Sequence, residues 1–279
     1  MGKVTCVVDD HAPVDPGLMQ EHGLSFRIET GSGIVLFDTG QTAGVLVHNL
    51  RNLGFDNDAI AALVLSHGHY DHTGGLEAVL RRRAGIALYA HPDVFRPRFS
   101  YHAGEYRPVG IPVSREALAE KTALHLDDTP VEILPGLWTT GEIRERSEPE
   151  GRSAHHFVRA GDGWIPDPYR DDLSLVLRGK QGVVLICGCC HAGLLNTLAH
   201  VERVFKRRVL AVVGGTHLIT ADDLVLAHVI DVLGKRYAGA DFYLNHCTGE
   251  KAFGKLAAAF GKRVRPCPAG TVIDFPSLS

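Results

Sequence analysis

The chain has 279 residues, of which 45% are hydrophobic and 22% are charged, and its formal net charge is −3. This length suits one large domain or two small ones, and the composition is that of an ordinary globular protein. The slightly acidic balance gives no reason to expect binding to nucleic acid or to an anionic membrane. No apolar run approaches the roughly 20 residues that a membrane-spanning helix needs.

The N-terminus, from Met1 to Cys6, lacks the apolar stretch and cleavage site of a signal peptide. Six cysteines in a chain of this length do not form a disulfide framework, and three of them crowd together at Cys187, Cys189 and Cys190. We therefore expect reduced thiols and a cytoplasmic protein. A homo-oligomer is compatible with this composition.

Apolar runs and turn signals predict closely spaced strands and helices in the first third of the chain. The turn Thr30 to Gly33 indicates a hairpin, and Asp38-Thr39-Gly40 leads into the first helix. In chain order, we predict strands at 24–29 and 33–37, a helix at 43–53, a strand at 61–65, a helix at 75–83 and a strand at 86–90.

Residues from about 92 to 170 have a different character. Their periodicity is poor, and proline, glycine, arginine and aromatic residues are interleaved, which is typical of lids and binding loops. We predict one domain over residues 1–279, in which this segment is an insertion that covers the active site, with a strand near Val131 to Leu134. Its aromatic rings suit a flat substrate ring, whereas its arginines are offset by glutamates and indicate a solvated loop.

Regular alternation returns in the last third, where strands end in histidine or cysteine and a helix follows each of them. Open α/β folds place their chemistry at the carboxyl ends of strands, and the repetition suggests two similar halves that face one another. In chain order, we predict strands at 173–177 and 183–186, a helix at 194–205, a strand at 209–213, a helix that is capped by the segment Thr220-Ala221-Asp222-Asp223 and runs through Leu233, a strand at 241–244 and a helix at 251–260.

Four potential metal ligands fall within six positions directly after the third predicted strand. His67 and His69 flank Gly68 in a tight turn, so their imidazoles can converge, and Asp71 and His72 lie one step further along. One pair of ligands for each of two adjacent metal ions is the simplest use of such a segment. Imidazole and carboxylate together suit zinc, with iron or manganese as alternatives. Two adjacent cations lower the pKa of a bridging water and hold the attacked group.

The segment Ser66-His67-Gly68-His69-Tyr70-Asp71-His72 resembles the signature of the metallo-β-lactamase fold superfamily, and Leu36-Phe37-Asp38-Thr39-Gly40 resembles the strand and turn before it. The resemblance implies an α/β fold, an αββα sandwich with a dinuclear metal site at one edge of its two sheets. Further motifs are similar to a subgroup that contains archaeal dihydropterin-ribofuranosylaminobenzene-phosphate synthases and metal-dependent hydrolases. These motifs are Glu21-His22-Gly23-Leu24-Ser25, Asp171-Asp172-Leu173-Ser174-Leu175, Gly188-Cys189-Cys190-His191-Ala192-Gly193, Gly214-Gly215-Thr216-His217-Leu218 and Asn245-His246-Cys247-Thr248-Gly249.

The resemblance also implies a set of metal ligands. The residues that match the superfamily pattern directly are His67, His69, Asp71, His72 and, at the end of a late strand, His246. Better-known members add a histidine in a glycine-rich turn and an aspartate after the next strand. Here the first position falls near Asp171-Asp172, and the second reads Gly188-Cys189-Cys190-His191. We predict His191 as the replacement ligand and Cys189 as the second candidate. The alternative for Cys189 is a structural role as a small buried side chain.

Three residues are predicted to act in catalysis. The resemblance implies that Asp71 is both ligand and proton acceptor. His22 and His217 lie where an α/β face would present them to a substrate, with helix capping or a core position as the alternative. Asp38 is predicted to orient a ligand by hydrogen bonding rather than to bind metal itself.

Hydrolysis of a small phosphorylated or ester-containing substrate is the default reaction for such a centre. The subgroup implies an alternative, in which an aryl nucleophile displaces pyrophosphate from a hydroxymethyl-dihydropterin diphosphate, so that the substrate is pterin-like. A diiron redox enzyme of this fold would carry glutamate in place of His69 and a flavin domain, and this chain has neither. A non-catalytic ligand or redox sensor is disfavoured by the intact motif.

Overall fold

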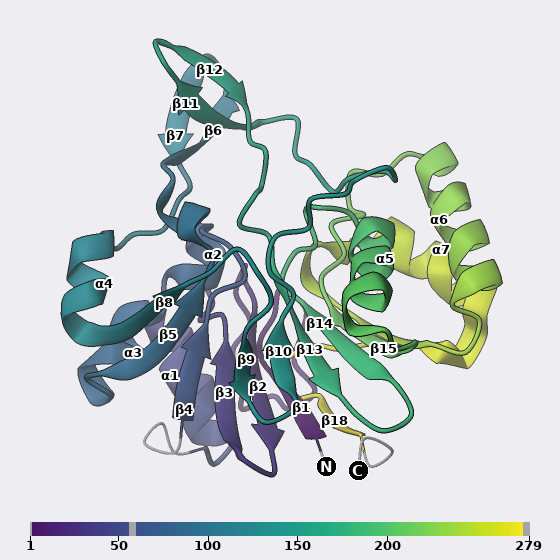
Figure 1. The fold of residues 1–279 in the computed structure, drawn as a ribbon, viewed down its shortest axis with the longest axis horizontal. Helices are drawn as coiled ribbons and strands as arrows, with labels where there is room; N and C mark the ends of the chain where they lie inside the picture. Colours follow the sequence, from purple (N-terminus) through teal and green to yellow (C-terminus); the bar gives the residue numbers. More distant parts are fainter. Residues whose placement is uncertain (1, 56–59, 276–279) are drawn as a thin grey trace.

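The computed structural model describes residues 2–55 and 60–275. Two seven-stranded sheets pack face to face, helices cover their outer faces, and a small four-stranded sheet projects from one end (Figure 1). A central core lies between the two sheets, and a further core lies under each helical layer. The predicted αββα arrangement is therefore confirmed.

The first sheet is ordered β18-β1-β2-β3-β4-β5-β8. Helices α1, α3 and α4 cover its outer face, where Leu46, Val79 and Leu118 pack on Leu36 and Leu63. The elements are β1 (Gly2–Val8), β2 (Ser25–Thr30), β3 (Gly33–Phe37), α1 (Ala43–Asn52), β4 (Ile60–Val64), α2 (Tyr70–Thr73), α3 (Leu76–Arg82), β5 (Ile86–Ala90), α4 (Arg115–Lys121), β8 (Thr122–Leu126) and β18 (Val272–Phe275).

The second sheet is ordered β17-β16-β15-β14-β13-β10-β9, and helices α5, α6 and α7 cover its outer face. Its parallel strands are apolar on both faces because each face is buried. The elements are β9 (Glu132–Leu134), β10 (Leu137–Thr139), β13 (Ser174–Arg178), β14 (Val183–Cys187), α5 (Leu194–Phe205), β15 (Val209–Gly214), α6 (Asp223–Arg236), β16 (Asp241–Leu244), η3 (His246–Thr248), α7 (Glu250–Phe260), η4 (Gly261–Arg263) and β17 (Val264–Pro266).

Strand direction explains where the polar side chains gather. Strands β3, β4, β5 and β8 are parallel, as are β14, β15, β16 and β17. Strand β1 runs the same way as β3, because two antiparallel pairings separate them. The carboxyl ends of β1, β3, β4, β14, β15 and β16 therefore meet at one end of the sandwich.

The structure is more regular over residues 92–170 than the sequence predicts. This segment contains η2 (Pro92–Phe95), helix α4 and seven strands, of which β8, β9 and β10 belong to the main sheets. The other four form the projecting sheet, which we call the arm: β6 (Arg98–His102), β7 (Glu105–Pro108), β11 (His156–Ala160) and β12 (Gly163–Pro166). Its strands lack apolar alternation because neither face of the arm is fully buried, and residues 140–155 do stay irregular.

The other predicted elements are confirmed to within a few residues at their ends. Strands β1, β17 and β18 are additions that the sequence did not predict; β17 and β18 are edge strands, and β1 lies between β18 and β2. None of the described helices is both long and apolar enough to cross a membrane.

Asn49 of α1 is a fully buried polar side chain that anchors the segment between β1 and β2. Its amide nitrogen donates to the carbonyls of Val7 (2.7 Å) and Met19 (2.8 Å), and its oxygen accepts from Met19 N (2.8 Å). We expect Asn49→Ala to lower the free energy of unfolding by about 2–4 kcal/mol, because it leaves buried backbone groups unpaired. Urea unfolding measures this. Asn52→Ala on the same helix is the control, and an equal loss in both variants would contradict the anchoring role.

Candidate metal centre

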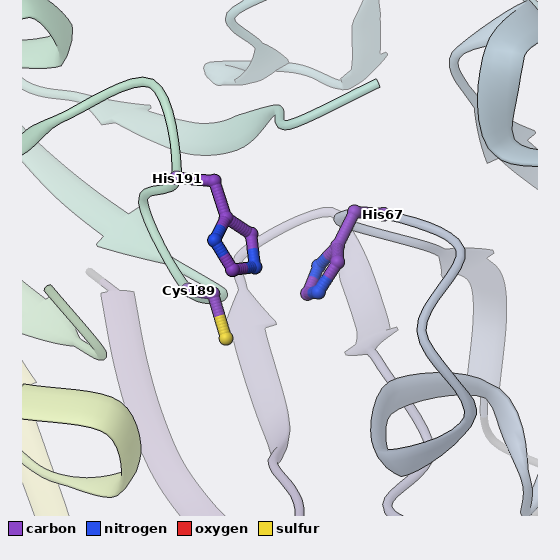
Figure 2. A group of neighbouring side chains, drawn as sticks. All are labelled: His67, Cys189 and His191. Atoms are coloured by element: carbon purple, nitrogen blue, oxygen red, sulfur yellow. The ribbon is translucent and has the colours of Figure 1, made fainter. Parts of the chain in front are cut away.

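Two overlapping groups of buried side chains lie where the strand ends meet. One group is His67, Cys189 and His191, and the other is His72, Cys189 and His246; within each, the potential ligand atoms lie within 4.8 Å of one another. Figure 2 shows the first group, with the two imidazoles turned toward one another from the loops after β4 and β14 and Cys189 beside them. Cys189 is common to both groups, so the two positions are adjacent.

The carboxylate of Asp38 orients two of these histidines. Its Oδ2 accepts from His72 Nδ1 at 2.7 Å and from Ser66 Oγ at 2.6 Å, and its Oδ1 accepts from Ser66 N at 2.7 Å. Because Ser66 Oγ donates to Asp38, it accepts from His67 Nδ1, which lies 2.8 Å away. The expectation that Asp38 orients a ligand agrees with these bonds, which direct Nε2 of both rings at the centre.

His191 is oriented from its far nitrogen as well. Its Nδ1 donates to the carbonyl of Gly151 at 2.9 Å, and its Nε2 is buried without a hydrogen-bond partner in the described part of the chain. Burial, followed by the neighbouring imidazoles, holds the pKa values of His67, His69 and His191 well below the usual range. Neutral, buried imidazoles with free lone pairs are what a divalent cation binds, so these donors fit a metal ion.

Asp71 and His69 lie against the two groups without being members of them. Oδ2 of Asp71 is 3.4 Å from His72 Nε2 and 3.5 Å from His246 Nε2, and His69 Nδ1 is 2.9 Å from His67 Nε2. The structure therefore brings together all seven of the predicted metal ligands. Asp172 instead accepts from Ala192 N at 2.8 Å and supports the backbone of the 188–193 turn.

Asp10 is a site residue that the sequence analysis missed. Its two oxygens bond to Nδ1 of His22 at 2.9 Å and to Nδ1 of His246 at 2.6 Å. The same three residues form a third group with the spacing of metal ligands. The available signal was the apolar run of β1, which ends directly before Asp9 and Asp10 at the same edge as the other strand ends.

His217 lies on the side of the centre formed by β15. Its ring centroid is 4.3 Å from that of His191, and burial lowers its pKa to about 4. It lines a cavity of about 220 Å³ together with Gly151, Arg152 and the start of α5. His217 therefore lies beside the centre and lines this cavity, and its role toward a substrate stays a prediction.

The arm is joined to the centre by a buried cluster of charges. Arg98, at the start of β6, is 1% exposed and donates to Asp167 Oδ2 at 2.8 Å and to Asp171 Oδ1 at 2.5 Å. The other oxygen of Asp171 accepts from the backbone N–H of Gly68 at 2.8 Å. Arg98 therefore fixes the turn between His67 and His69. The interpretation of Arg98 as part of a solvated loop is wrong, because its partners are distant in sequence.

Two further residues of the 92–170 segment reach the centre. Tyr169 stacks on His191 with the ring centroids 4.0 Å apart, and its hydroxyl is 2.8 Å from His156 Nδ1. The ring of His156 is 4.9 Å from that of His69. The other aromatic side chains proposed as a substrate platform, such as Tyr106 and Trp164, stack on one another in the arm.

Left-handed backbone concentrates at this site. Among the described residues other than glycine, seven have positive φ, and five of these lie in or beside the centre: Asp38, Tyr169, Cys190, His217 and His246. Such conformations cost roughly 1 kcal/mol or more each and persist only where surrounding contacts enforce them. Here they turn the chain directly after β3, β14, β15 and β16, where the residues of the centre lie.

The sequence of residues 19–192 matches the family model of the metallo-β-lactamase superfamily, and the chain belongs to this superfamily. It is 30% identical to the 7,8-dihydropterin-6-methyl-4-(β-D-ribofuranosyl)-aminobenzene-5'-phosphate synthase of Methanocaldococcus jannaschii, over 98% of this chain and 96% of the relative. The structure of Tm1679, a metal-dependent hydrolase of the β-lactamase superfamily, is 26% identical and aligns with a TM-score of 0.83 over 99% of both chains. A diphosphatase of the PhnP family shares the fold, with a TM-score of 0.54, 14% identity and coverage of 100% of this chain and 99% of the other.

The buried charge cluster yields a prediction for Arg98→Met. Removing the cation leaves two buried carboxylates unpaired, so we expect a loss of about 3–5 kcal/mol in the free energy of unfolding. Urea unfolding of the metal-free protein measures it. Arg96→Met is the matched control, because Arg96 is half-exposed and lies 3.7 Å from Asp93, and it should cost about 1 kcal/mol or less. Similar losses in both variants would show that the buried cluster does not support the fold.

Proposed function

We propose that the protein is a hydrolase with two divalent metal ions, zinc in the first place, that acts on a small phosphorylated or ester-containing substrate. The observation that carries the proposal is the pair of buried ligand groups that share Cys189. His67, His69 and His191 would hold one ion, Asp71, His72 and His246 would hold the other, and Cys189 would contact both. When bound, two adjacent cations lower the pKa of water and polarise the group under attack.

Side chains of this protein would accept the proton, contact the substrate and exclude water. Asp71 carries an oxygen that faces three imidazoles, His22, His72 and His246, and would accept a proton from the attacking water. His217 would contact the substrate from the 220 Å³ cavity at the start of α5. Tyr169, which is fully buried, and His156 would exclude bulk water on the side of the arm.

The second candidate is the transfer reaction. The observation in its favour is the 30% identity to the archaeal dihydropterin synthase, which extends over nearly the whole of both chains. In this reaction an aryl nucleophile displaces pyrophosphate from a dihydropterin diphosphate. Both reactions need cations beside phosphate oxygens, so the same ligand groups would serve either of them.

Turnover distinguishes the two functions. The zinc-loaded protein should hydrolyse at least one of a generic phosphodiester, a thioester and a lactone, and chelation of the zinc should abolish the activity. Steady-state kinetics on the three substrates measures this. Inactivity on all three, together with tight binding of a dihydropterin diphosphate, would replace the hydrolase with the transferase.

A single ligand substitution tests the assignment of His191. We expect His191→Ala to lower kcat/KM at least 100-fold and to weaken binding of one metal equivalent, because Nε2 would be a ligand. His200→Ala is the control. His200 is also a buried histidine, but it lies on α5 away from the centre, and its Nε2 bonds to the carbonyl of Thr140 at 3.0 Å. Full activity and two bound equivalents in His191→Ala would contradict the assignment.

A further inference from the structure

His22 and His246 span the same two carboxylates. Asp10 bonds to Nδ1 of each ring, at 2.9 Å for His22 and 2.6 Å for His246. On the far side of the rings, Nε2 of His22 is 3.4 Å and Nε2 of His246 is 3.5 Å from the same oxygen, Oδ2 of Asp71. The ring centroids are 5.4 Å apart. The two imidazoles therefore lie side by side and share the same two carboxylate partners.

In neutral imidazoles, these contacts turn three nitrogen lone pairs toward the same oxygen of Asp71. An ionised carboxylate only accepts, so Asp10 takes the Nδ1–H of both rings, and in neutral imidazoles Nε2 is then a bare acceptor. Both acceptors face Asp71 Oδ2. His72 Nε2 joins them, 3.3 Å from His246 Nε2, because its own Nδ1 donates to Asp38. Nitrogen lone pairs and a carboxylate oxygen at these distances repel one another unless a proton or a metal ion lies between them, and in the metal-loaded protein the metal ion takes this place.

We propose that His22 is a further ligand of the metal ion held by Asp71, His72 and His246, and that Asp10 is the positioning residue for both His22 and His246. The proposal rests on the second metal position of the proposed function. It changes the role predicted for His22 from contact with the substrate to metal binding. The side chain of His22 is 55% exposed, whereas that of His246 is 1% exposed, so His22 would be the solvent-exposed member of this set of ligands.

Zinc binding tests the proposal directly. The metal-free protein is titrated with Zn²⁺ in competition with a chromophoric chelator, for the wild type and for His22→Ala, His22→Gln and Asp10→Asn. We expect each variant to weaken the second equivalent at least 10-fold and to leave the first within about twofold. The Co²⁺-substituted variants should in parallel show a changed visible absorption for that equivalent, which loss of a side chain that only contacts the substrate would not cause.

Two matched controls accompany these variants. His48→Ala removes a histidine of α1 that bonds to the carbonyl of Gly17, and Asp15→Asn changes an exposed carboxylate that bonds to Gly17 N. Both should bind zinc as the wild type does. Because His22 is half-exposed, its variants should fold, and thermal unfolding of the metal-free proteins checks this.

The outcomes separate this inference from the proposed function. A second equivalent that binds His22→Ala and His22→Gln as tightly as the wild type overturns the role of His22. An unaltered second equivalent in Asp10→Asn overturns the positioning role of Asp10. A wild-type protein that binds fewer than two equivalents would contradict the proposed function itself.

Discussion

The carboxylate of Asp38 is the constraint on which the centre depends. It is fully buried at the end of β3, and it holds His72 directly and His67 through Ser66. These two histidines belong to different ligand groups, so one side chain fixes the orientation of both halves. A buried carboxylate without partners would be costly, and the bonds from Ser66 and His72 compensate for its desolvation. The bonds that stabilise Asp38 therefore also leave Nε2 of both rings directed at the centre.

Other histidines of the centre are also oriented by a hydrogen bond at the nitrogen that faces away from it, with different partners. His191 is held from Nδ1 by the carbonyl of Gly151, and His246 is held by Asp10. Because each ring is fixed at its far nitrogen, the ligand atoms already lie close together before a metal ion binds. Such preorganisation lowers the conformational entropy that metal binding would otherwise have to remove. The arm contributes through Arg98, whose carboxylate partner Asp171 fixes the backbone at Gly68.

The sequence predicted the layers, the ligand segment after β4 and the late histidine, because local apolar patterns and one contiguous motif carry that information. It did not predict Asp10, since its role depends on β1 running beside β2 and ending near β16, which are distant in the chain. The cluster around Arg98 was missed for the same reason: Asp167 and Asp171 lie 69 and 73 positions away. The strands of the arm were missed because their half-exposed faces do not show the alternation that buried strands show.

The most direct test of the two-metal centre is a crystal structure of the zinc-loaded protein with anomalous scattering at the zinc edge. We expect two peaks, one between His67 and His191 and one between His72 and His246. Each peak should lie about 2.3 Å from Cys189 Sγ. A single peak, or two peaks from which the thiol of Cys189 is turned away, would contradict a centre in which this cysteine is shared.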